Sequence, residues 1–172
     1  MHKAYPVPPP RESVLESLYA DADLIDAFAI ALPAGAPDDI GVLTRALWGG
    51  RSPWWVRSLM ATRDAVVALV GIKTSRQIGA AAAARGAVIG FFPVVSQSAS
   101  ELIVGANDRH LDFRAATLVR AGADGGRELV VVSVVHCHNA LGRTYLWGIG
   151  PFHRVIVRAT LERAVRSLSS DA

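Results

Sequence analysis

The chain has 172 residues, of which 51% are hydrophobic, and its formal net charge is +3. A chain of this length can bury roughly 70% of its unfolded surface, which is enough for one self-sufficient core. The arginines are scattered rather than gathered in a tail, so composition argues against nucleic-acid binding. We therefore expect one globular domain over residues 20–170, preceded by an extended lead-in over residues 1–19.

Neither a membrane span nor a secretory signal is expected from the sequence. Residues 1–10 lack the apolar core of a signal peptide. The apolar stretch 79–95 is interrupted by Arg85 and Pro93 and is too broken to span a bilayer. Cys137 is the single cysteine, so no disulfide forms within the chain. These features favour a cytoplasmic protein and leave a homodimer open.

The first half of the chain predicts a short helix, then one strand and two further helices. The proline-rich residues 6–10 predict an extended segment, and residues 11–19 a short helix. Residues 22–32 predict a strand that ends at a proline. A helix is expected over 40–47, since it follows two aspartates and ends before two glycines. A serine and a proline then predict the start of a second apolar helix over 53–70.

The second half predicts a run of antiparallel strands. Residues 87–96 and 101–106 are strand candidates. Residues 110–119 and 128–138 are rich in β-branched side chains, and the glycine-rich loop between them favours a hairpin. Both faces of 128–138 are largely apolar, so we expect this strand to be central and covered on both sides.

The hairpin register is expected to bring polar side chains together. With the loop centred near residue 123 or 124, Asp112 lies opposite His136, and His110 lies opposite His138. Strand alternation then places His110, Asp112, Arg114, His136 and His138 on one face, at one end of the hairpin. The cluster has three readings: a hydrogen-bonded polar end, polar contacts to a ligand, or a metal site. We expect neither a metal ion nor a cofactor.

The last part of the chain predicts a long helix. Residues 139–150 contain three glycines and predict a connection, after which Pro151 is expected to open the helix. Arg143, Tyr145 and His153 flank that start, where backbone amides could bind an anion. The alternative is that Arg143 caps strand carbonyls and His153 lies on the surface.

Further candidates concern a ligand wall, a nucleophile and a charged stripe. Ser133 and Cys137 face away from His136, so neither is expected to form a nucleophile pair with it. The i+4 spacing of Arg154, Arg158, Glu162 and Arg166 predicts a solvated stripe on the helix. Trp54, Trp55 and Trp147 could form an aromatic wall against which a ligand packs. The alternative is that these side chains pack in the core.

The order of the predicted elements indicates an α+β fold. Three spaced motifs carry a closer resemblance: PWWVRSLM at 53–60 with Arg63 and Asp64, NDRHLDF at 107–113, and the spaced residues from Val134 to Arg154. On these motifs the chain resembles the bacterial family described as domain of unknown function 2867, in the helix-grip, or START-like (SRPBCC), superfamily.

The resemblance covers about residues 20–166. It implies a curved antiparallel sheet packed on a long C-terminal helix, with two short helices after the first strand. It also implies a cavity for an apolar or amphipathic small molecule between sheet and helix, and it assigns no catalytic residue.

Three functions follow as hypotheses. The first, which we favour, is a protein that binds a small hydrophobic or amphipathic molecule between the sheet and the last helix. The second is an enzyme that uses general acid–base chemistry, such as cyclisation or hydrolysis, with Asp112 and a histidine as proton carriers. The third is a structural or partner-binding module without a cavity.

Overall fold

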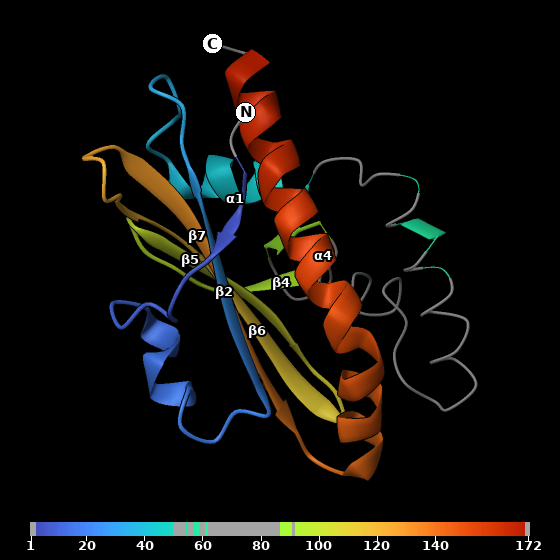
Figure 1. Ribbon diagram of the computed structural model, residues 1–172. Helices are drawn as coiled ribbons and strands as arrows, with labels where there is room; N and C mark the ends of the chain where they lie inside the picture. The colour runs from blue at the N-terminus through green and yellow to red at the C-terminus, as the bar shows by residue number, and fades with distance from the viewer. Residues whose placement is uncertain are drawn as a thin grey trace.

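The computed structural model of the chain describes residues 3–49, 54, 57–58, 61, 87–90 and 92–170. Within this part, antiparallel strands form one sheet in the order β1-β2-β7-β6-β5-β4-β3, and the predicted α+β class is confirmed (Figure 1). The strands are β1 Tyr5–Pro6, β2 Leu24–Ala31, β3 Val88–Ile89, β4 Phe92–Gln97, β5 Glu101–Asn107, β6 Leu111–Ala121 and β7 Arg127–Cys137. The helices are the 3-10 helix η1 Val14–Leu18, α1 Ile40–Trp48 and α4 Ala140–Ser170. The predicted helix over 53–70 lies outside the described residues, apart from four isolated helical positions.

Both faces of the sheet are covered, as the sequence of β7 predicts. On one face, Val131 packs in a cluster with Leu161 of α4. On the other, Val130 packs in a cluster with Leu15 of η1. Figure 1 shows α4 and η1 on opposite sides of the sheet. Every residue of 128–135 is buried, and each buried valine contributes roughly 1.5–3 kcal/mol relative to an exposed one.

The hairpin of β6 and β7 has the predicted register. Asp112 pairs with His136, and the His138 amide donates to the His110 carbonyl at 2.9 Å. The turn is tight because Gly125 adopts a positive φ of 78°, which glycine adopts without a side-chain penalty. The Asp124 carboxylate also accepts from the Gly126 amide at 3.0 Å.

The predicted strand over 87–96 is divided into β3 and β4. The break is at Gly90, whose φ is 65°. A β-carbon at this position would lie 2.5 Å from the backbone oxygen of Trp48. Glycine is therefore required both by the turn and by the close approach of α1.

The proline-rich N-terminal segment is extended, and its first residues join the sheet. Tyr5 and Pro6 pair with β2 as an edge strand, where a proline is tolerated. The short helix expected over 11–19 is the 3-10 helix η1. Its start is held to the sheet by buried Glu101, which accepts from Ser13 Oγ at 2.5 Å and from the Val14 amide at 3.0 Å.

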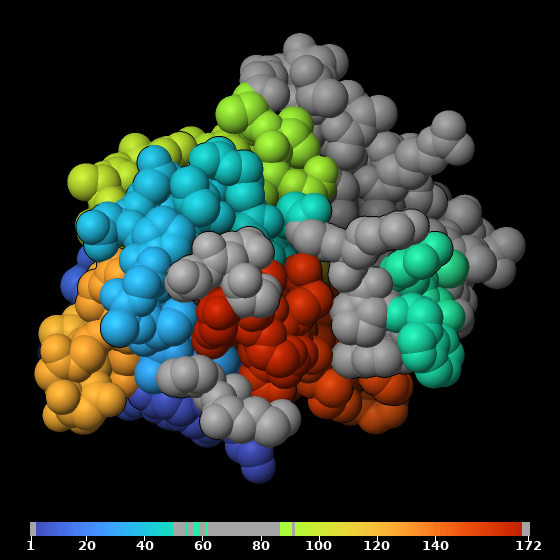
Figure 2. Space-filling view, turned by 90° about the horizontal axis from the view of Figure 1, so that it is seen from above, coloured from blue at the N-terminus to red at the C-terminus, as the bar shows by residue number. Residues whose placement is uncertain are grey.

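The helix predicted over 40–47 is α1, and it packs beside the C-terminal half of α4. Asp39 caps α1 by accepting from the Val42 amide at 2.9 Å, and the helix ends at Gly49. Arg163 of α4 donates to the Leu47 carbonyl at 2.5 Å. In Figure 2, the C-terminal end of α4 lies against α1 and the segment that follows β2.

The prediction that Pro151 opens the last helix is wrong, because α4 begins at Ala140 and continues through Pro151. Asn139 caps this earlier start with two hydrogen bonds. The side-chain oxygen of Asn139 accepts one from the Gly142 amide at 3.0 Å, and the backbone carbonyl of Asn139 accepts the other from the Arg143 amide at 3.2 Å. Glycine lowers helix propensity by about 1 kcal/mol. Here capping and the packing of Tyr145 against the sheet outweigh that effect. No helix in the described part of the chain is both long and apolar enough to cross a membrane.

Candidate functional site

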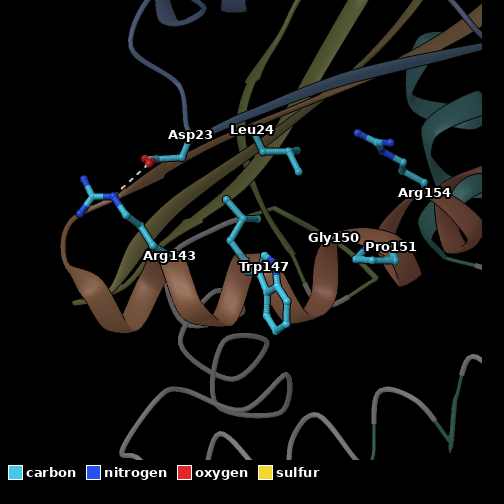
Figure 3. A pocket seen from close by; sticks show the side chains of 8 residues that line it. Asp23, Leu24, Arg143, Trp147, Gly150, Pro151 and Arg154 are labelled. Carbon is cyan, nitrogen blue, oxygen red and sulfur yellow. Dashed lines mark ion pairs between the residues drawn. The ribbon is translucent and has the colours of Figure 1, made fainter.

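A groove of about 490 Å³ lies between the N-terminal half of α4 and the start of β2 (Figure 3). Leu24 and Leu146 form its apolar middle, and Trp147 and Pro151 border it from the helix. The side chain of Trp147 is 85% exposed. The eight residues that line the groove are Asp23, Leu24, Arg143, Leu146, Trp147, Gly150, Pro151 and Arg154.

At one end of the groove, Asp23 contacts a backbone amide and an arginine side chain. Its Oδ2 atom accepts from the Cys137 amide at 2.6 Å, and its Oδ1 atom lies 3.3 Å from Nε of Arg143. The Cys137 N–H, together with the charge of Arg143, holds the pKa of Asp23 below its ordinary value, although burial opposes this shift. Burial and the nearby Asp23 charge raise the pKa of the Cys137 thiol, which disfavours its thiolate form.

At the other end, Arg154 extends from α4 toward β2 (Figure 3). Its side chain is exposed and forms no ion pair with another residue that the structure describes. The groove therefore has an internally paired charge at one end and a second cationic group at the other, with an apolar surface between them.

A second polar cluster lies beneath α4, on the same face of the sheet. Asp26 of β2 and Ser133 of β7 are cross-strand partners. The Nε2 atom of His153 lies 3.1 Å from Ser133 Oγ and 3.4 Å from Asp26 Oδ1. The Asp26 side chain is 8% exposed, and neither of its oxygens has a hydrogen bond within the described structure. The imidazole is thus the polar partner of a buried carboxyl group.

This cluster does not have the geometry of a nucleophilic serine. In a serine–histidine–aspartate relay, the carboxylate holds one ring nitrogen and the other nitrogen takes the serine proton. Here the same Nε2 atom faces both Ser133 and Asp26. The edge of the His153 ring also packs near Phe113, with 6.4 Å between the ring centroids. The arrangement therefore fastens α4 to β2 and β7.

Comparison with known proteins places the chain in a family. Residues 18–160 match the family model described as protein of unknown function (DUF2867). The chain belongs to this family. The predicted family is therefore confirmed, and the matched range includes every residue of the groove and of the Asp26 cluster. No curated protein and no solved structure matches the chain.

In this DUF2867 protein, the polar residues predicted at the end of the hairpin divide between the two faces. Asp112 lies 3.3 Å from His138 and pairs with His136, on the face opposite α4. Arg114 donates to the Phe113 carbonyl at 2.8 Å. Acid–base catalysis by Asp112 and a histidine stays a prediction.

His110 does not lie with them, so the prediction of one shared face is wrong for this residue. Its buried ring packs edge-on against Tyr145 of α4, with 5.4 Å between centroids. His110 precedes β6 in a bend, where strand alternation no longer fixes the direction of a side chain. The five residues therefore do not all share one face of the hairpin, and ligand binding by them stays a prediction. Among the described residues, no group of three or more His, Cys, Asp or Glu side chains is arranged to hold a metal ion.

The other candidates are placed as follows. Arg143 lies within the first turns of α4 and pairs with Asp23 instead of capping a strand. The predicted anion site at a helix start at Pro151 is wrong because that residue is internal to α4. Trp54 is 77% exposed and does not line the groove, whereas Trp147 does. Trp55 lies outside the described residues.

Sequence reasoning missed Asp23, Asp26 and Arg154 as parts of a site, and it placed Ser133 only relative to His136. The available signal was Asp26, the one polar residue of β2, together with Ser133 inside the valine-rich stretch of β7. Their meeting depends on the pairing of β2 with β7, which are separated by about a hundred residues of sequence. Hydrophobic pattern alone does not specify such a long-range pairing.

Proposed function

We propose that this protein binds an amphipathic small molecule in the groove between β2 and α4. The observation that carries the proposal is the groove itself, with apolar residues in its middle and arginines at both ends. Its volume of about 490 Å³ falls within the roughly 300–1,000 Å³ typical of small-molecule sites. We further propose that the fold is a helix-grip fold, since an antiparallel sheet holds a long C-terminal helix across one face.

The exposure of Trp147 supports this function. A tryptophan buries a large apolar area when it makes contacts, and such residues are enriched at binding surfaces. Trp147 is 85% exposed and is among the residues that line the groove, as are Leu24 and Leu146. An apolar molecule in the groove would cover part of the indole ring and gain contact with both leucines.

The test uses the neutral fluorescent probe N-phenyl-1-naphthylamine, which reports on apolar sites without requiring a charge. We expect the wild-type protein to bind it saturably, and Trp147→Ala to weaken binding by roughly tenfold through loss of apolar contact area. Trp54→Ala is the matched control, because it removes another largely exposed tryptophan, which does not line the groove. Absence of saturable binding, or equal loss in the two variants, would refute the proposal.

A further inference from the structure

We infer that the groove takes a molecule with one anionic head group, such as a carboxylate, sulfate or phosphate ester, and that Arg154 binds that head group. This inference rests on the proposed function, because it names the class of ligand for the same groove. It begins from the charges of the lining residues, which are one aspartate and two arginines. Their sum, −1 + 2 = +1, leaves one positive charge uncompensated.

Asp23 and Arg143 neutralise each other's charge at one end of the groove. Asp23 accepts from the Cys137 amide at 2.6 Å and lies 3.3 Å from Arg143. A cationic ligand would have to displace Arg143 to reach this carboxylate. A free anion would find Arg143 already paired. The Asp23 end is therefore a poor site for a second charged group of either sign.

The uncompensated charge is Arg154. Its side chain points from α4 toward β2 (Figure 3), and it makes no ion pair with any other described residue. A guanidinium offers a planar pair of N–H donors that matches the oxygens of a carboxylate or phosphate. Arg154 therefore provides the recognition chemistry for an anion.

The apolar middle of the groove fixes the direction of such a ligand. Arg143 and Arg154 are eleven positions apart, which is about 16 Å along a helix that rises about 1.5 Å per residue. Leu24, Leu146 and Trp147 also line the groove. With its head group on Arg154, the ligand would lay its apolar body against these side chains, toward Arg143.

The experiment compares three amphiphiles that share one chain and differ in the head group: dodecanoate, dodecan-1-ol and dodecylammonium. Each is titrated into the wild-type protein with bound N-phenyl-1-naphthylamine, at concentrations below micelle formation, and displacement of the probe is measured. We expect dodecanoate to bind roughly tenfold more tightly than the alcohol, as one charge-assisted hydrogen bond at an exposed site would give, and dodecylammonium to bind most weakly. Inorganic phosphate alone should not displace the probe, because it lacks the apolar body.

Arg154→Gln should abolish the preference for dodecanoate while leaving the affinity for the alcohol unchanged. Arg158→Gln is the matched control, since Arg158 is an exposed arginine one turn further along α4 that does not line the groove. Unchanged thermal unfolding of both variants would show that they are folded.

The outcomes separate the two proposals. Saturable probe binding without discrimination between head groups would overturn this inference alone. A preference for dodecanoate that survives Arg154→Gln, or that Arg158→Gln removes equally, would also overturn it. Displacement by inorganic phosphate would point to a site for a free anion and refute the amphiphile class. Failure of the probe and of all three amphiphiles to bind would refute the proposed function itself.

Discussion

The Nε2 atom of His153 lies 3.4 Å from Oδ1 of Asp26, and this contact joins α4 to the sheet just after Pro151. Proline lacks an amide proton, so the helix loses one internal hydrogen bond at that point. Val157 and Leu161, further along α4, are buried in the core, whereas the residues of α4 from Arg143 to Arg154 include those that line the groove. The His153 imidazole therefore holds α4 against β2 near Pro151.

The pairing of His153 with Asp26 can be tested with a double-mutant cycle. His153→Leu should destabilise the protein by about 1–3 kcal/mol, because it leaves a buried carboxyl group without its imidazole partner. Adding Asp26→Leu should recover most of that loss, since hydrophobic residues can replace a buried polar pair. Urea unfolding measures the free energies. Additivity of the two single substitutions to within about 0.5 kcal/mol would show that the residues do not interact.

Substitution of two glycines of α4 by alanine should change the stability of the protein in opposite directions. A β-carbon at Gly142 would lie 2.1 Å from the backbone oxygen of His110, so Gly142→Ala should destabilise the protein by more than about 2 kcal/mol. Gly148 is exposed, and apart from its chain neighbours and the nearby helix backbone no atom would lie within 4 Å of such a β-carbon, so Gly148→Ala should stabilise by about 0.5–1 kcal/mol. Thermal and urea unfolding of the pair give the comparison. Destabilisation by both substitutions would contradict the placement of Gly148.

The depressed pKa of Asp23 predicts a loss of stability in acid. A carboxylate with a lowered folded-state pKa contributes its full stability above the unfolded value of about 3.9, and loses it as pH falls through the lower folded value. The difference in unfolding free energy between wild type and Asp23→Asn should therefore be constant above about pH 5 and shrink below about pH 4. Asp21→Asn, at an exposed neighbour, is the control. A difference that stays constant down to pH 2 would exclude this role.

Glu101 should hold the N-terminal segment to the sheet. Glu101→Ala removes the acceptor for Ser13 Oγ and the Val14 amide, and hydrogen bonds to a charged group contribute about 1.5–3 kcal/mol. We expect a loss of that size in urea unfolding, with faster proteolytic cleavage before residue 20. Glu16→Ala, at an exposed position on η1, should change stability by less than about 0.5 kcal/mol. Equal sensitivity of both variants to protease would argue against the role of Glu101.

Local pattern explains which parts of the fold were predictable. Alternating β-branched residues and a glycine-rich turn set the β6–β7 register, so the pairing of Asp112 with His136 follows from the sequence. The start of α1 at Ile40 was predictable in the same way, because Asp39 is a capping residue directly before an apolar helix. Both features depend on interactions between residues that are close along the chain.

The last helix shows where local pattern misleads. Its glycines and Pro151 indicate a connection, yet α4 runs from Ala140 because Asn139 caps it and Gly142 lets it approach the hairpin. The same approach brings Tyr145 against His110 and draws that histidine out of the predicted cluster. These outcomes depend on how α4 docks on the sheet, which propensity does not encode.

By itself, the sequence determined the α+β class, the hairpin register and the burial of β7 on both faces, because period-two alternation and turn residues act over short distances. Only the tertiary structure decided which polar residues meet. Asp26, Ser133 and His153 come from three separate elements, and the groove between Asp23 and Arg154 exists because β2 pairs with β7 beneath α4. Such contacts between distant segments arise from packing of the whole chain, and no local pattern specifies them.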